Sequence, residues 1–531
     1  MAAIREWKNS FTPINRIPLD VLSLIPTHLP SLRDRLVSTF VCRLWRRTFI
    51  QRAELWSELS LPDDETFVKT LLERSKGSGL DITIENGDPV GAIVLLSPHT
   101  ERMKHLNLRR CDWPGIQKFS RVNSGPLPLL QSLVIHLRTE PVPESLDRTP
   151  PSSLLLINAV NLRSLNIQSF SRLSPFLTHF IFPNLVSFNL IAMPSEKFQV
   201  SQLLDFLEAS PALQIVHMFI LADTSFESIP QKRLVLLPNV EKFILLTSHG
   251  GCCYEIAAHI SCPSARRTSL THKNAPDHSI PAAMFPIPVS WDKIVHQYTR
   301  SSVEEVALEI DNGRVTTCKL IFWSPDEIAV ELCCRVVIRT RSQGIDGLGP
   351  LLVEVNKEVF TQATRAIQNY PQLKNIKRLR ISQSRSFPHP ANVLHIQNEV
   401  GRLFKTLGPL EGLMLELCDM RPYLDPFIEP PEPEDSGIRE SVVFPPIQEL
   451  VISHPLFLSD EQFTAAIVGL AKSQHARGIP FESVTIYAYN MSTDVEEELR
   501  PWVGNAEYSH EEPPITEKDE NWVGEDDQDD W

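Results

Sequence analysis

The chain has 531 residues with 42% hydrophobic and 22% charged side chains, a composition ordinary for a folded soluble protein. No apolar run approaches the ~18 residues that a membrane span requires, and the N-terminus lacks the apolar core of a secretory signal. The net charge of −14 is mostly local, because the residues from Asn505 to Trp531 carry eleven acidic side chains and one lysine. The rest of the chain is nearly neutral, so its charge gives no sign of a nucleic-acid partner. Because a membrane span and a secretory signal are both missing from the sequence, we expect a cytoplasmic or nuclear protein without a membrane partner.

The first helical pattern begins at Ile17-Pro18, where proline occupies the first turn and its missing N–H is tolerated. Leu19 and Leu22 then mark an apolar face with helical spacing. Pro26 removes a backbone donor and clashes with the preceding turn. We therefore expect this helix to kink or end at Pro26.

A second helical pattern follows the cap residue Ser31, with Asp34 three residues later, and it carries two adjacent rows of apolar residues. The rows consist of Leu32, Leu36, Phe40, Leu44, Val37, Val41, Trp45 and Phe49. Such a stripe predicts one helix that is buried against two neighbours. A short third element carries Leu55 and Trp56. A domain this small cannot bury much surface alone, so it needs a partner.

Several spaced signals in this region agree with one another. They are Ile17-Pro18-x-x-Val21-Leu22, His28-Leu29-Pro30, Val41-Cys42-Arg43-x-Trp45-Arg46 and Leu55-Trp56. Together they resemble an F-box, and more narrowly the large F-box set of mushroom-forming fungi. The resemblance implies a region that binds a Skp-type adaptor and, through it, a cullin. The adaptor-binding positions that it implies are Ile17, Pro18, Leu19, Val21, Leu22, Ile25, Val41, Cys42 and Trp45. The alternative is an unrelated helical domain whose pattern is core packing.

After this region a short phrase recurs, in which an apolar residue is followed by two variable residues, an apolar one, a variable one and an apolar one. Its copies begin at Met103, Leu130, Leu162, Leu185, Leu213, Val240, Ala265 (degraded), Val303, Ile376, Leu410 and Ile447. The first seven are 23 to 32 residues apart, the later ones 34 to 38, except for a 73-residue gap that could hide a copy. This period is typical of a leucine-rich-repeat solenoid, here degenerate and rich in insertions.

Many copies follow a proline by two residues, as Leu185 follows Pro183. We expect proline to stop the preceding element and to extend the chain before the strand. Cys111 and Cys418 each lie three residues beyond the last apolar position of a copy. Leucine-rich repeats place Asn or Cys there, bonded to the loop backbone, so the resemblance implies a structural role for both thiols.

The predicted fold class is α/β, with a small three-helix F-box followed by an irregular leucine-rich-repeat-like α/β solenoid. A helix is expected near Leu458 to Ala476, leading into a final strand. The expected domains are an N-terminal extension over residues 1–12, a helical domain over 13–61, the solenoid over 62–500 and a disordered acidic tail over 501–531. We expect the tail from Asn505 onward to be dispensable for folding.

Catalytic motifs are absent from the sequence: there is no phosphate-binding loop, no nucleophile elbow and no His-Glu-x-x-His. We therefore expect no enzyme, no catalytic residue and no cofactor. The densest cysteine cluster, Cys252, Cys253, His259 and Cys262 with His249 upstream, could suggest zinc. Because adjacent cysteine side chains diverge, we favour free thiols and expect no metal.

Two functional hypotheses remain. The F-box resemblance implies a substrate receptor of a cullin–RING ubiquitin ligase, in the ubiquitin-like conjugation pathway, with an unidentified target protein bound to the repeats. The alternative is a protein-interaction scaffold that is not coupled to ubiquitination. Intervening positions of the phrase should form one outward surface, on which Lys377, Arg378 and Arg380 are the densest basic spot. This trio could bind an acidic or phosphorylated segment of a target, or be an ordinary solvated strand surface.

Overall fold

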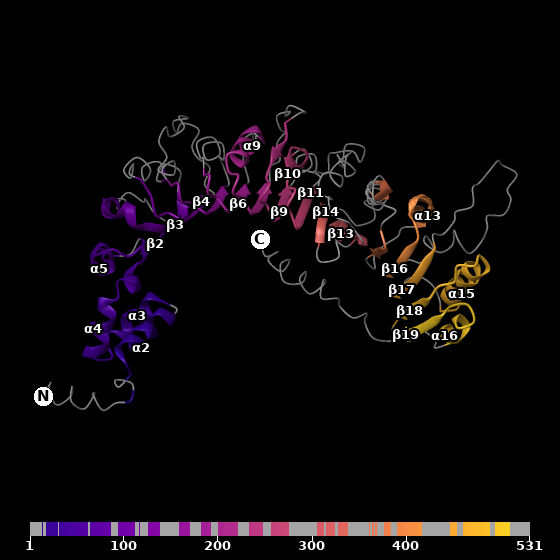
Figure 1. The fold of residues 1–531 in the computed structure, drawn as a ribbon, viewed down its shortest axis with the longest axis horizontal. Coiled ribbons are helices and arrows are strands. Elements are labelled where there is room, and N and C mark those ends of the chain that lie inside the picture. The colour runs from indigo at the N-terminus through magenta and orange to yellow at the C-terminus, as the bar shows by residue number, and fades with distance from the viewer. Residues whose placement is uncertain are drawn as a thin grey trace, which may run out of the picture. The chain divides into compact units, whose positions relative to one another are not determined.

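The structure is a computed structural model of a mixed α/β protein (Figure 1). Contacts between backbone atoms divide the chain into two compact units, Met1–Pro230 and Gln231–Trp531, which are described separately. The structure describes residues 13, 17–29, 31–61, 64–85, 94–111, 116, 126–137, 159–169, 182–192, 200–220, 233–247, 256–274, 305–312, 315–323, 328–337, 361, 364–365, 367–368, 376–383, 390–416, 446–453, 460–488 and 494–509.

The first unit begins with short helices. Helix α2 (Leu19–Leu24) ends just before Pro26, as predicted, and continues as the 3-10 helix η2 (Ile25–His28). Next come α3 (Leu32–Ser38), α4 (Arg43–Gln51) and the 3-10 helix η3 (Ala53–Trp56). The side chain of Ser31 accepts a hydrogen bond from the Asp34 N–H at 3.1 Å, so the predicted cap of α3 is confirmed.

The prediction of one continuous second helix is wrong, because the chain leaves the helix between α3 and α4. The hydroxyls of Ser38 and Thr39 donate to the carbonyls of Arg35 and Leu36 at 2.6 and 2.7 Å, three residues back. Such side-chain bonds compete with the helical ladder. The guanidinium of Arg46 donates to the Thr39 carbonyl at 3.1 Å, so a partner from α4 satisfies the freed backbone.

The sheet of the first unit is parallel throughout. Its strands pair with their neighbours in chain order: β1 (Glu58–Leu61), β2 (Leu80–Glu85), β3 (Met103–Cys111), β4 (Ser132–Leu137), β5 (Ser164–Ser169), β6 (Ser187–Ala192) and β7 (Ile215–Ile220). Helix α5 (Glu65–Ser75) lies between β1 and β2 in the chain, and α9 (Val200–Glu208) precedes β7. Because β1 pairs with β2, the last residues of the predicted helical domain belong to the sheet.

The repeated phrase aligns in register across these strands. The middle apolar positions form one buried row: Leu106, Leu133, Leu165, Phe188 and Val216. The last apolar positions form a second buried row: Leu108, Ile135, Ile167, Leu190 and Met218. The residues between them are less buried, so the predicted alternation of inward apolar and outward variable positions is confirmed.

The prolines before the copies have a different role from the one expected. Each is the second residue of a turn closed by a hydrogen bond to the carbonyl three residues back, such as Leu185 N–H to Phe182 O at 3.1 Å. Proline favours this turn position because its φ is preset. The turns are also linked to one another, since the Asn184 amide donates to the Val160 carbonyl at 2.8 Å.

Cys111 is buried beside a carbonyl of strand β2, whereas the resemblance implies a bond to the loop backbone. Arg110 adopts a left-handed conformation (φ 53°), and the register between β3 and β4 shifts by one residue there. This bulge turns Cys111 back to the buried side, where its thiol lies 3.9 Å from the carbonyl oxygen of Ile84 on β2. Cys418 lies outside the described residues.

The second unit contains two parallel runs joined by antiparallel strands. β9 (Lys242–Thr247), β11 (Arg267–Asn274) and β14 (Ile328–Val337) pair in parallel. β13 (Val315–Trp323) pairs antiparallel with β14 and with β12 (Glu305–Asn312). Within the 73-residue gap, where a hidden copy was considered, the described strands are therefore β13 and β14 of this meander.

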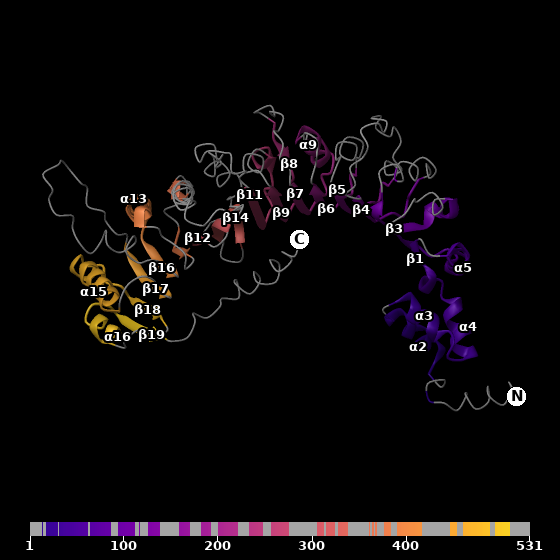
Figure 2. The same ribbon diagram turned by 180° about the vertical axis from the view of Figure 1, so that it is seen from behind.

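The parallel pairing resumes from β12 through β15 (Arg378–Gln383), β16 (Leu410–Glu416), β17 (Ile447–Ser453), β18 (Ser483–Tyr487) and β19 (Asn505–Ser509). Helix α13 (Pro390–Thr406) precedes β16, and the predicted helix near 458–476 is confirmed as α15 (Asp460–Ala476). Helix α16 (Asp494–Leu499) contacts both α15 and β19, as Figure 2 shows. A separate pair, β8 (Val235–Leu236) and β10 (Ile260–Ser261), is also parallel.

The predicted tail boundary at residue 501 is wrong, because β19 belongs to the sheet. Ala506 and Tyr508 lie opposite Val484 and Ile486 of β18, and the Tyr508 hydroxyl donates to the Ala488 carbonyl at 2.8 Å. This segment therefore forms a strand despite its acidic residue Glu507, because β18 supplies backbone hydrogen-bond partners. Residues 510–531 lie outside the described residues. In the described part of the chain, none of the helices is both long and apolar enough to cross a membrane.

Candidate protein-docking surface

The helical region exposes an unusual share of large apolar side chains. Six of the twelve exposed large hydrophobic residues in the described part of the chain belong to it. These six, called the helical surface below, are Leu19 (54% exposed), Val21 (46%), Leu24 (50%), Val37 (59%), Phe40 (71%) and Val41 (57%). Single exposed hydrophobic residues are ordinary, whereas six within 23 residues of one small region make that region the candidate interaction surface of the described chain.

A small but complete core holds these side chains in place. Leu22, Phe49 and Trp56 are fully buried, and α2 packs against α4. The indole N–H of Trp56 donates to the Phe49 carbonyl at 3.0 Å, so its one polar group is satisfied. The Arg74 guanidinium of α5 lies 5.0 Å from the centre of the Trp56 ring, a cation–π distance. The helical surface therefore rests on a packed framework that continues into α5.

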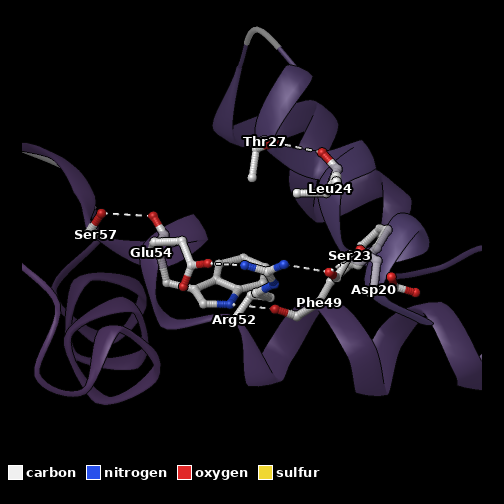
Figure 3. Close-up of polar contacts among 9 residues, drawn as sticks. Asp20, Ser23, Leu24, Thr27, Phe49, Arg52, Glu54 and Ser57 are labelled. Atoms are coloured by element: carbon white, nitrogen blue, oxygen red, sulfur yellow. Dashed lines mark hydrogen bonds and ion pairs between the residues drawn. The ribbon is translucent and has the colours of Figure 1, made fainter. Parts of the chain in front are cut away.

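Polar contacts tie α2 to η3, as Figure 3 shows. Arg52 donates to the hydroxyl of Ser23 and to the carboxylate of Glu54, the latter at 2.6 Å. Ser23 in turn donates to the Asp20 carbonyl at 2.6 Å. A bond from its own backbone N–H and then the Arg52 guanidinium lower the pKa of Glu54 below its ordinary value. Glu54 therefore remains ionised at neutral pH and keeps Arg52 in place.

Most positions predicted to bind the adaptor are accessible, and one is not. Pro18, Leu19, Val21 and Val41 are exposed, while Ile17, Ile25, Cys42 and Trp45 are half-buried. Leu22 is fully buried, which corrects its placement on the docking surface. The reason is helical geometry: Leu22 lies on the buried side of α2, and the side chains of Val21 and Leu24 point in other directions. The Trp45 ring packs on Phe49, with centroids 5.2 Å apart, so it serves the core in part.

Three members of the helical surface were not predicted to be exposed. Val37 and Phe40 belonged to a stripe assigned to the core, and Leu24 was not singled out for docking. The adjacent hydroxyl residues Ser38 and Thr39 were the available signal, since they end α3 and turn Val37 and Phe40 away from the core. The Arg46 guanidinium lies 5.5 Å from the centre of the exposed Phe40 ring. Arg33, Arg43 and Arg47 are also exposed, so arginines accompany the apolar side chains.

Two members of the basic trio predicted to bind a target, Lys377 and Arg380, are paired with acidic neighbours. Arg380 donates through Nε and Nη2 to one oxygen of Glu416, at 3.2 and 2.8 Å, and both side chains are more than four-fifths buried. Lys377 Nζ lies 3.7 Å from Glu411 Oε1. Arg378 and Glu449 approach Gly412 from either side, since a Cβ there would lie 3.5 Å from Arg378 Cγ and 3.7 Å from Glu449 Oε2.

This arrangement does not present a basic site. Parallel pairing sets acidic residues of β16 and β17 beside the basic residues of β15. A phosphorylated segment would have to compete with these carboxylates for the same guanidinium and ammonium groups. The prediction of a target site at Lys377, Arg378 and Arg380 therefore has no support in the geometry.

The cysteine-rich cluster considered for zinc is described only in part. The His259 ring nitrogen Nδ1 lies 2.6 Å from the Arg233 carbonyl oxygen, and burial raises the pKa of the Cys262 thiol to about 12. A thiol that stays protonated is a poor metal ligand. Over the described ranges, no three His, Cys, Asp or Glu side chains gather closely enough to hold a metal ion. His249, Cys252 and Cys253 lie outside those ranges.

Comparison with known proteins adds no family assignment. No protein-family model matches the chain, and no curated protein matches its sequence. Functional inference therefore rests on the residues of the helical region, on their exposure and on the paired strands that follow them.

Proposed function

We propose that the chain is the substrate-recognition subunit of a cullin–RING ubiquitin ligase. Its helical region would be an F-box that binds a Skp-type adaptor, and its strands a leucine-rich-repeat-like solenoid that binds a target protein. One observation carries the proposal: Leu19, Val21 and Val41, at positions where the sequence resembles an F-box, are about half exposed on a packed helical framework.

The exposed side chains supply a driving force for docking. Fully burying one large apolar side chain is worth about 1.5–3 kcal/mol, so covering six that are half exposed is worth about 6 kcal/mol before the cost of association. The exposed arginines would add charge-assisted contacts at the rim. A partner with an apolar groove and acidic edges fits this surface.

The strand region supports the second half of the proposal. In both units, successive parallel strands bring copies of the repeat phrase into register, which buries one face and leaves the other accessible. Such an extended outward face suits protein binding. In this proposal the chain performs no chemistry itself. It raises the concentration of the target near the ubiquitin-charged enzyme and makes their encounter intramolecular.

The test is adaptor capture with matched charge insertions. Leu19→Asp with Val41→Asp places two carboxylates on the helical surface, at residues that the core does not need. Leu129→Asp with Val160→Asp is the control, because these residues have similar exposure (47% and 55%) but lie at turns between strands. A Skp-type adaptor should co-purify with the wild type and the control and be lost from the first variant.

Circular dichroism of both variants establishes that each is folded. If the adaptor binds the folded Leu19→Asp, Val41→Asp variant as well as the wild type, the docking surface is wrong. If the folded wild type captures no adaptor, the alternative of a scaffold uncoupled from ubiquitination replaces the proposal.

A further inference from the structure

The outward face of strands β4 to β7 carries no charged side chain. All twelve positions on it are half-buried or exposed. They are Ser132, Val134, His136, Ser164, Asn166, Gln168, Ser187, Asn189, Ile191, Ile215, His217 and Phe219. At the chain's own 22% of charged residues, two or three of the twelve would be Asp, Glu, Lys or Arg. This set is called the neutral strip below.

The neutrality ends at the strands on its N-terminal side. On β2 and β3 the same face carries Asp81, Glu85 and Arg109, with Arg109 Nη1 3.4 Å from Glu85 Oε1. Burial, and then the positive charge of Arg109, lower the pKa of His136, so that its imidazole is neutral near pH 7. The neutral strip is thus a local feature and differs from the ion pairs that Lys377 and Arg380 form with residues of β16.

The neutral strip combines a polar part with an apolar part. Asn166 and Asn189 are register neighbours on β5 and β6, and Gln168 lies two residues further along β5. The side-chain oxygens of Asn166 and Asn189 are buried and have no hydrogen-bond donor within reach in the described part of the chain. Ile191 and Phe219, register neighbours on β6 and β7, form the apolar part.

An unsatisfied buried oxygen is unfavourable by about 1–3 kcal/mol. Rotation about the terminal side-chain bond of asparagine is soft, so each amide can turn its oxygen outward when a donor approaches. A bound chain that supplies N–H donors would therefore find two amide oxygens that form no hydrogen bond among the residues that the structure describes.

We infer that the neutral strip binds an uncharged, extended peptide segment of the target, whose backbone N–H groups meet Asn166 and Asn189 while an apolar side chain packs on Ile191 and Phe219. The inference deepens the proposed function and rests on it only in calling the bound protein a ligase target. Because the neutral strip lacks charged side chains, we expect its occupant to be uncharged. A charged segment would lose hydration against half-buried neutral side chains that offer no counter-charge.

The dimensions agree with a short segment. Neighbouring strands are about 4.8 Å apart, so β4 to β7 span about 14 Å, the length of four or five extended residues. A random peptide of about eight residues therefore covers the neutral strip with some margin.

The test selects phage-displayed random peptides of about eight residues on the full chain. Selected peptides should lack Asp, Glu, Lys and Arg over a stretch of four or five residues and contain a large apolar residue. Asn166→Leu, which keeps the approximate size of the side chain and removes the acceptor, should weaken their binding about tenfold, as should Phe219→Ala. Asn505→Leu is the matched control, because Asn505 is exposed and belongs to β19, not to the neutral strip.

Charged selected peptides, the absence of any selected peptide, or equal binding to folded Asn166→Leu and wild-type chains would overturn the inference. Adaptor capture measured on the same variants keeps the two ideas separate. The proposed function fails if the adaptor does not bind, whatever the peptides do. The neutral strip fails if peptide binding ignores Asn166 and Phe219 while adaptor capture is intact.

Discussion

Leu19 and Leu22, three residues apart on α2, should respond in opposite ways to the same substitution. Leu22 is fully buried, so Leu22→Ala leaves a cavity against α4 and should destabilise the helical region by about 3 kcal/mol. Leu19 is 54% exposed, so Leu19→Ala should lower the stability by less than about 1 kcal/mol. Identical chemistry at both sites means that only burial can separate the results.

Hydrogen–deuterium exchange of the peptides that cover α2 and α4 is the appropriate assay, because a chain of two units need not unfold in one step. Leu22→Ala should reduce amide protection in both helices by about a hundredfold, since each 1.4 kcal/mol is a factor of ten. Leu19→Ala should leave protection nearly unchanged and weaken adaptor capture instead. Leu19→Ala is therefore expected to affect adaptor binding and not the packing of the helical core.

Equal loss of protection in the two variants would refute the assignment of Leu22 to the core and Leu19 to the surface. The assignment would also be refuted if Leu22→Ala left exchange unchanged while it abolished adaptor binding. In that case the leucine predicted from the F-box resemblance would be a contact residue after all.

Four further predictions concern the strands and the buried thiol. Truncation after Ser509 should leave exchange in β18 unchanged, whereas truncation after Gly504 removes β19 and should accelerate it at least about tenfold. Because burial raises the pKa of Cys262 from 9.0 to about 12, its thiol should resist iodoacetamide at pH 8 until urea is added. The unfolded thiol ionises first, so stability from this group should be lost as the pH rises from about 9 to 12, measured by urea unfolding at each pH. Arg380→Glu should destabilise the β15–β16 pair by about 2 kcal/mol, because two carboxylates then meet, and Glu416→Arg in the same chain should restore it, as judged by exchange in β16.

Periodicity alone located much of the fold. In the repeat phrase, the apolar residues at i+3 and i+5 face the same side of a strand, because side chains of a strand alternate between its two faces. This alternation depends only on local backbone geometry. The buried rows through Leu106 and Leu108 therefore follow from sequence. The stop at Pro26, the cap at Ser31 and the inward return of Cys111 are likewise local, since each depends on one residue and its near neighbours.

Other features depended on partners distant in the chain. Glu507 belongs to an acidic stretch, yet its segment is a strand because β18 offers a ladder that composition cannot reveal. Lys377 and Arg380 read as a basic site, but register places Glu411 and Glu416 beside them, more than thirty residues away in sequence.

The sequence by itself determined which residues alternate, which segments start or stop, and that the helical region is too small to bury its apolar side chains. Only the tertiary structure decided that Leu22 is core while Phe40 is exposed. It also decided that Lys377 and Arg380 are paired, and that the uncharged positions of β4 to β7 share one face. The physical reason is that burial and ion pairing are properties of neighbours in space, and those neighbours are set by strand register and helix packing.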